Sequence, residues 1–182
     1  MLNRYIKLFV SFCVLISLCS CNTVSNSNKD FEIYTYNYDF QFYGFDNDDI
    51  SLKASTVSAL KSVLDNSKTA VFTISSPTCL SCKNALTFIN DVAIKHNLTI
   101  YNIDPYSSEY PVFDTEDYDV LLSLLDVIGI NGDADFELPI VLIINKGNID
   151  VHLIGFDHTN GLTYDQNLDI FDKLLSSSTL YK

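Results

Sequence analysis

The stretch that decides the fold reads Ala70-Val-Phe-Thr-Ile-Ser75, Ser76-Pro77-Thr78, Cys79-Leu80-Ser81-Cys82. Its first six residues form a short apolar run, which predicts a strand buried on both faces of a sheet. From Cys79 to about Asn97 the apolar residues recur at helical spacing, which predicts a helix. The two cysteines therefore lie where a buried strand gives way to a helix.

This placement gives the two cysteines different chemistry. Backbone N–H groups and the positive end of the helix dipole stabilise an anion, so they favour a reactive thiolate at Cys79. Cys82 lies one helical turn further along the chain. At that distance its thiol can attack a mixed disulfide formed by Cys79. The spacing predicts a nucleophile and a resolving thiol in one local geometry.

The segments around this junction predict an α/β fold. Besides the helix after Cys79, helices are expected over residues 48–64, 116–128 and 164–175. Strands are expected over residues 70–75, 98–104, 140–144 and 149–154, with a hairpin turn at 145–148. This order predicts one mixed sheet covered by helices on both faces.

An aromatic stretch precedes these elements. Between residues 34 and 42, tyrosine and phenylalanine alternate with polar residues. A period of two with aromatic side chains predicts an extra strand or hairpin with one buried face. A stacking platform for a sugar or a peptide is the alternative interpretation of the same pattern.

The N-terminus is interpreted as a targeting segment. Residues 8–18 form an apolar run that is too short to span a bilayer, and Leu18-Cys19-Ser20-Cys21 resembles a bacterial lipobox. This predicts a signal peptide over 1–20, lipidation of Cys21, a tether over 21–30 and one domain over 31–182. The protein would then be anchored by lipid on the extracytoplasmic face of the cell membrane. An ordinary secretory signal with unmodified Cys21, or an uncleaved membrane anchor, are the alternatives.

Charge and cysteine usage narrow the function. Two of the 11 bases and none of the 23 acids precede residue 21, so the mature chain would carry 9 bases against 23 acids, a net charge of −14. Such an acidic surface repels phosphate backbones, which excludes nucleic-acid binding. Cys79 and Cys82 would then be the only free thiols of the mature chain. A single pair does not fit a small domain that is held together by many disulfides.

The order of these features resembles the thioredoxin family. Over about residues 51–175 the chain shows the following order: strand, Cys-x-x-Cys, helix, a strand with Asn-Ile-Asp at 102–104, helix, a strand opened by Pro139, a Lys-Gly turn, strand and helix. The resemblance extends to lipid-anchored extracytoplasmic thioredoxin-like proteins, including the bacteriocin-transport accessory group. It implies a thioredoxin-like fold and a monomeric thiol–disulfide oxidoreductase without a cofactor. Its partners would be protein thiols or disulfides and a membrane redox partner.

The resemblance also assigns roles to residues. It implies that Cys79 is the nucleophile and Cys82 the resolving thiol. Pro139, with a cis peptide bond in the family, would form a substrate-binding ledge with Leu138. The residues before and after the first cysteine complete the expected substrate-binding set: Thr78 and Leu80.

The chain departs from the family pattern at several positions. Thr78 stands where thioredoxins carry Trp, and Leu80-Ser81 replaces Gly-Pro between the cysteines. Thr73 stands where the family places a buried acid that takes the proton of the resolving thiol. Ser81 replaces the His that disulfide oxidases often carry. The residues therefore leave open whether the protein reduces, oxidises or isomerises disulfides.

The cysteine pair has two other interpretations. The first is a metal site, but a structural zinc needs four ligands, the pair supplies two, and His96, His152 and His158 form no second paired motif. No metal site is therefore expected.

The second interpretation stays open. In it, the protein is a redox-inactive binding or adaptor lipoprotein of thioredoxin fold, accessory to peptide export for example, and the pair is a structural disulfide.

Overall fold

The computed structural model describes residues 31–46, 50–110, 114–129, 137–155 and 161–178. Its central feature is a five-stranded sheet with the order β1-β3-β2-β4-β5. The strands are β1 (Leu52–Ala54), β2 (Ala70–Ile74), β3 (Ile100–Ile103), β4 (Ile140–Asn145) and β5 (Asn148–Ile154). β1, β3 and β2 run parallel, whereas β4 is antiparallel to both β2 and β5. This is the mixed sheet that the sequence predicts.

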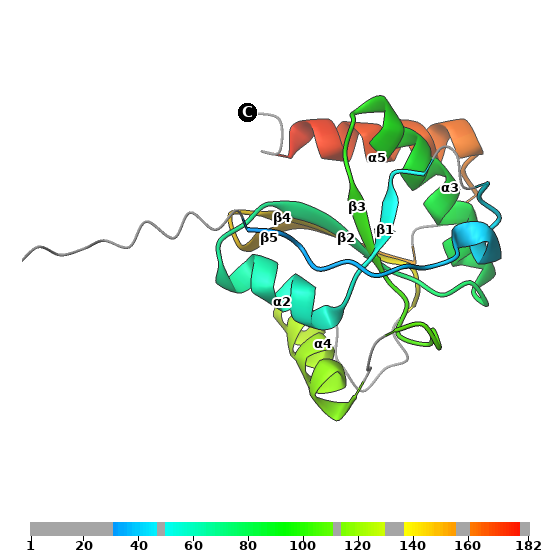
Figure 1. The fold of residues 1–182 in the computed structure, drawn as a ribbon. Coiled ribbons are helices and arrows are strands. Elements are labelled where there is room, and N and C mark those ends of the chain that lie inside the picture. Colours follow the sequence, from blue (N-terminus) through cyan, green and yellow to red (C-terminus); the bar gives the residue numbers. More distant parts are fainter. Residues whose placement is uncertain (1–30, 47–49, 111–113, 130–136, 156–160, 179–182) are drawn as a thin grey trace, which may run out of the picture. The chain divides into compact units, whose positions relative to one another are not determined.

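Helices cover both faces of the sheet (Figure 1). They are α2 (Val57–Asp65), α3 (Leu80–Lys95), α4 (Thr115–Val127) and α5 (Tyr164–Ser177). α3 packs with α5 on one face and α2 packs with α4 on the other. The strand order, the strand directions and the two helical layers are those of a thioredoxin-like fold, so the predicted fold class is confirmed.

Burial explains why these residues form these strands. All five residues of β2 are buried, as expected for a central strand covered on both faces. Along β5, exposed residues alternate with half-buried ones, because this strand forms an edge of the sheet. The turn between β4 and β5 is the predicted one, with Lys146 and Gly147 both at positive φ.

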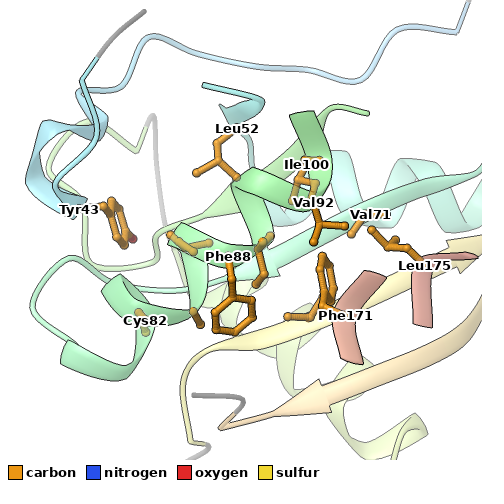
Figure 2. Close-up of a cluster of buried hydrophobic side chains, with 14 of the residues drawn as sticks. Tyr43, Leu52, Val71, Cys82, Phe88, Val92, Ile100, Phe171 and Leu175 are labelled. Atoms are coloured by element: carbon orange, nitrogen blue, oxygen red, sulfur yellow. The ribbon is translucent and has the colours of Figure 1, made fainter. Parts of the chain in front are cut away.

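The core beneath α3 and α5 joins residues far apart in the sequence (Figure 2). Phe88 and Val92 from α3 meet Phe171 and Leu175 from α5 in one buried cluster with Val71 of β2. Cys82 belongs to the same cluster. Cys82, the expected resolving cysteine, is therefore part of the core, whereas Cys79 lies at its edge, packed against it.

The expected helix over residues 48–64 is wrong in its first half. Leu52–Ala54 is strand β1, paired in parallel with β3, and the helix begins only at Val57. Thr56 caps it, because its side chain accepts a hydrogen bond from the N–H of Ala59. Leu52 is a buried residue of β1, so it satisfied the helical spacing by coincidence; the backbone groups of β3 decide that it lies in a strand.

The expected aromatic strand or hairpin is an extended segment with a single antiparallel bridge, from Tyr36 to Ala54. A 3-10 helix, η1 (Phe40–Tyr43), follows it at once. The side chain of Asp39 accepts a hydrogen bond from the N–H of Gln41 and so starts this turn. The alternation correctly predicted an inward face for Tyr36, Tyr38 and Phe40, whereas Tyr34 and Phe42 at the two ends of the segment are exposed.

Candidate active site

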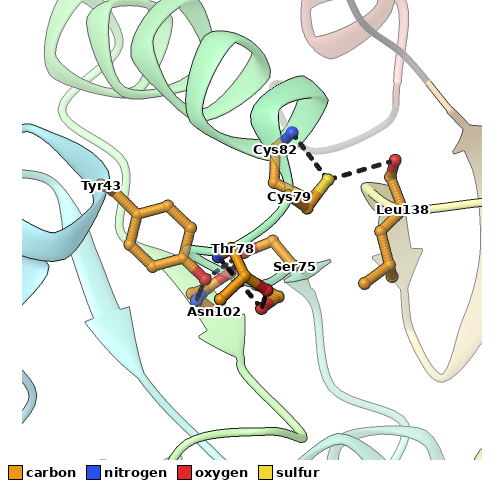
Figure 3. Close-up of a disulfide and its surroundings, with 8 residues drawn as sticks. Tyr43, Ser75, Thr78, Cys79, Cys82, Asn102 and Leu138 are labelled. Carbon is orange, nitrogen blue, oxygen red and sulfur yellow. Dashed lines mark hydrogen bonds between the residues drawn. A yellow bond between two sulfur atoms is a disulfide. The ribbon is translucent and has the colours of Figure 1, made fainter.

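The cysteine pair lies at the junction that the sequence predicts. β2 ends at Ile74, and Cys79 is the N-cap residue of α3 with extended backbone angles. Cys79 and Cys82 form a disulfide, with their Cα atoms 5.2 Å apart (Figure 3). Cys79 is half-buried and Cys82 is buried, so an incoming sulfur atom reaches Cys79 first.

The start of α3 is arranged to stabilise negative charge on Cys79. The backbone N–H of Cys82 donates to Cys79 Sγ at 3.1 Å. The first turn of α3 contains no acidic residue. In the reduced protein, this N–H and the helix dipole both favour the thiolate of Cys79 over its thiol.

The carbonyl group of Leu138 faces the same sulfur atom from the side opposite the Cys82 N–H (Figure 3). The Leu138–Pro139 peptide bond is cis, as the family resemblance implies. The carbonyl oxygen of Leu138 lies 3.7 Å from Cys79 Sγ, although the two residues are 59 positions apart in the sequence. Pro139 itself is buried, so the surface of the expected ledge consists mainly of Leu138 and its backbone.

The other two expected substrate-binding residues flank Cys79 in the sequence. Thr78 is exposed, and its hydroxyl forms a hydrogen bond of 2.9 Å with the hydroxyl of Ser76. Leu80 is 67% exposed, so its side chain is accessible from solvent. The structure thus brings Thr78, Leu80 and Leu138 together around Cys79, with the carbonyl group of Leu138 directed at its sulfur atom.

A buried network of neutral polar groups lies beneath the cysteine loop (Figure 3). Thr73, at the position where the family has an acid, donates to Asn102 Oδ1 at 2.7 Å, and Ser75 donates to the same oxygen at 2.6 Å. The Tyr43 hydroxyl lies 2.9 Å from Ser75 Oγ. These groups satisfy one another without a charge.

Sequence reasoning missed Tyr43, Ser75 and Asn102 as neighbours of the site. One signal was present: Asn102 is a polar residue in a short apolar strand, and such a residue needs a buried partner. Tyr43 gave no signal, because it reaches the network only through the turn of η1.

Asp104, directly after β3, carries a perturbed carboxyl group. It accepts hydrogen bonds from the Tyr38 hydroxyl at 2.8 Å and from the N–H of Tyr106 at 3.1 Å. Burial raises the pKa of Asp104, and these two hydrogen bonds only partly oppose the rise. Burial likewise raises the pKa of Tyr38, with the neighbouring Tyr43 and Asp104 adding to it, so the Tyr38 hydroxyl keeps its proton.

The raised pKa of Asp104 predicts a specific pH dependence. Between the ordinary carboxyl pKa and the raised one, the folded protein binds more protons at Asp104 than the unfolded chain does. The contribution of Asp104 to the free energy of unfolding therefore falls as the pH rises through this window. In Asp104→Asn this contribution is gone, so in urea unfolding from about pH 4 to pH 7 the free energy of unfolding of the wild type should fall relative to that of Asp104→Asn as the pH rises.

Asp126→Asn is the matched control for this prediction, because Asp126 is an exposed acid on α4. Its profile should run parallel to that of the wild type. If Asp104→Asn also runs parallel to the wild type, the burial of the Asp104 carboxyl does not act on stability in this way.

Of the three histidines, the two that the structure describes, His96 and His152, do not form a ligand set with the cysteine pair. His96 ends α3 and contacts Asp172 of α5, where hydrogen bonds from Lys95 and His96 lower the pKa of Asp172. His152 is an exposed residue of β5, and His158 lies outside the described residues. Within the described ranges, no group of three His, Cys, Asp or Glu side chains is placed to hold a metal ion.

The predicted targeting segment, including Cys21, also lies outside the described residues. In the part of the chain that the structure describes, none of the helices has the length and apolar character needed to cross a membrane.

Comparison with known proteins gives only distant likenesses. No protein-family model matches the chain, and no curated protein matches it. Among solved structures, thioredoxin O2 from Arabidopsis thaliana in its oxidised state is similar at 14% identity and a TM-score of 0.43, covering 72% of this chain and 96% of that one. The disulphide isomerase from Xylella fastidiosa Temecula1 is similar at 17% identity and a TM-score of 0.40, covering 65% and 86%. The thioredoxin-like fold therefore stands on the strand order and helical layers of this chain itself.

Proposed function

We propose that this protein is a thiol–disulfide oxidoreductase that acts on protein thiols and disulfides. The observation that carries the proposal is the environment of Cys79. Cys79 is half-buried, and its sulfur atom accepts the N–H of Cys82 at the start of α3 and lies opposite the carbonyl of Leu138. A purely structural disulfide does not require an accessible sulfur atom at a helix N-terminus.

In the reducing direction, the Cys79 thiolate attacks one sulfur of a client disulfide. The client S–S bond breaks, a Cys79–client disulfide forms, and the other client sulfur leaves as a thiolate. Cys82 then loses its proton and attacks Cys79 Sγ, which releases the second client thiol and forms the Cys79–Cys82 disulfide. The client gains two electrons and the protein loses two.

The oxidising direction runs the same steps backward, from the disulfide form that the structure contains. Either direction needs a second exchange partner: a dithiol that reduces the pair again, or a disulfide that oxidises it. A membrane redox partner is our proposal for this role. Thr73 and its neutral network provide no buried carboxylate to take the proton of Cys82, so water is the proposed acceptor.

The reduction potential of the Cys79–Cys82 pair tests this function. The protein is equilibrated in glutathione buffers and the fraction of alkylated cysteine is read by mass spectrometry. A value near about −270 mV would identify a reductase, and one near about −120 mV an oxidant. A pair that stays oxidised below about −300 mV would be a structural disulfide. That outcome would replace the enzyme with the adaptor interpretation.

We propose further that the domain over residues 31–182 acts as a monomer at the extracytoplasmic membrane face, held by lipid on Cys21. The support is the apolar run over residues 8–18 and the lipobox-like quartet that ends at Cys21. In cells, Cys21→Ser should move the protein from the membrane fraction to the soluble fraction or leave it as an uncleaved precursor. A Cys21→Ser protein that is processed and fractionates like the wild type would contradict the lipid anchor.

A further inference from the structure

A hollow of about 260 Å³ lies beside the cysteine pair. One wall consists of Ser76, Pro77 and Thr78, the three residues that lead directly into Cys79. The rest of the lining comes from two other segments. Tyr38 and Phe42 belong to the aromatic segment around η1, and the remaining residues belong to the loop after β3, over residues 104–109. A chain whose cysteine reacts at Cys79 therefore has a neighbouring side chain within reach of this hollow.

The charged groups of the hollow are both acidic. Asp104 is 1% exposed and is held by the Tyr38 hydroxyl and the Tyr106 N–H. Glu109 is exposed, and its carboxylate accepts the N–H of Asp39 at 3.4 Å. Among the described residues that line the hollow, none is a lysine, an arginine or a histidine. The charge that this part of the lining presents to solvent is therefore the negative charge of Glu109.

Two aromatic side chains of the hollow stand open to solvent. Tyr106 is 72% exposed and Phe42 is 58% exposed. An aromatic face beside carboxylates attracts a cation twice, through the ring quadrupole and through direct charge attraction. Large apolar groups that remain exposed next to a reactive site often mark a binding surface.

We propose that this hollow binds a lysine or arginine side chain of the client, next in sequence to the cysteine that reacts at Cys79. The inference rests on the proposed oxidoreductase function and adds a class of substrate to it: polypeptides with a basic residue close to the reacting cysteine. The basic head group pairs with the exposed carboxylate of Glu109, close to the buried Asp104, and its aliphatic stem lies along Tyr106 and Phe42.

The test uses single-turnover exchange between the reduced protein and two synthetic peptides. Each peptide has one cysteine, blocked as a mixed disulfide with 2-mercaptoethanol, and either arginine or glutamine at the position directly next to it. Attack by Cys79 and then Cys82 releases peptide thiol and 2-mercaptoethanol and leaves the protein oxidised. The arginine peptide should react about fivefold faster at low salt, as expected for a cation held by an aromatic ring and a carboxylate. The advantage should shrink as sodium chloride is added.

Matched surface variants test whether the faster reaction of the arginine peptide depends on this hollow. Glu109→Gln and Tyr106→Ala should each lower the arginine advantage, and both sites are exposed, so the fold should tolerate them. Glu116→Gln and Tyr118→Ala make the same changes at exposed positions of α4, outside the hollow, and should leave the advantage intact. Equal loss in both sets would overturn the assignment to this hollow.

A small neutral substrate, bis(2-hydroxyethyl) disulfide, distinguishes a failure of the oxidoreductase function from a failure of the basic-residue site. If the reduced protein does not reduce it or either peptide, the oxidoreductase function itself is wrong. If the protein reduces it, but reacts equally with the arginine and glutamine peptides, the function stands and the basic-residue site is overturned. Faster reaction with the glutamine peptide would overturn it as well.

Discussion

Cys79→Ser should lower thiol–disulfide exchange by at least about a thousandfold, because a serine hydroxyl is not ionised near neutral pH and cannot replace a thiolate nucleophile. The expected loss follows from the position of the sulfur. Cys79 is the cysteine with access to solvent, and its Sγ is the atom that the Cys82 N–H and the Leu138 carbonyl face. The effect is measured as the rate at which the protein reduces a peptide disulfide, monitored through the peptide thiol that is released.

Cys82→Ser is the matched variant, since it also removes the disulfide but keeps the nucleophile. It should attack a client disulfide and then stop, because no second thiol is present to resolve the mixed disulfide. Non-reducing electrophoresis should show a protein–client adduct with Cys82→Ser and none with Cys79→Ser. Both variants are first compared with the wild type by circular dichroism, so that a folding defect is recognised. Full activity in folded Cys79→Ser protein would refute the proposed role of this cysteine.

Phe171→Ala should lower the free energy of unfolding by about 3–5 kcal/mol, the range measured for truncating a buried phenylalanine. Phe171 is buried on α5 and packs into the cluster that joins this helix to α3 and the sheet (Figure 2). Such a loss is a large part of the roughly 5–15 kcal/mol that stabilises a typical domain. Since the chain has no Trp, urea unfolding is followed by circular dichroism with the disulfide kept intact.

Phe42→Ala is the matched control for this prediction, because it deletes the same side chain from an exposed position on η1. It should change the free energy of unfolding by no more than about 0.5 kcal/mol. A comparable loss in both variants would mean that Phe171 does not contribute through burial in the core. Phe171→Leu should recover most of the lost stability, since it refills most of the cavity.

The sequence predicted those strands and helices whose hydrophobic pattern runs over enough consecutive residues to show its period. The apolar run of β2, the helical spacing of α3 and α5, and the turn at Lys146–Gly147 are properties of neighbouring residues. It failed at β1, a strand of three residues, because a segment so short carries too few residues to distinguish a period of 2 from one of 3.6. There the hydrogen-bonding partner in β3 decides the conformation.

The candidate site divides in the same way. Cys79 and Cys82 could be placed at a helix N-terminus from the sequence, because both positions depend only on the residues that follow. The neutral network around Asn102 could be anticipated only in part, from one polar residue in an apolar strand. Its partner Tyr43 was beyond prediction, since the turn of η1 that brings it there replaced the strand that the aromatic alternation suggested.

By itself the sequence determined that a cysteine pair stands between a buried strand and a helix, because hydrophobic periodicity and three-residue spacing act within one stretch of chain. Only the tertiary structure decided what faces that pair. The Leu138 carbonyl comes to Cys79 across 59 residues, and the hollow beside Thr78 combines three separate segments. Contacts of this kind depend on strand register and helix packing, which arise from many weak interactions over the whole core and leave no local pattern to read.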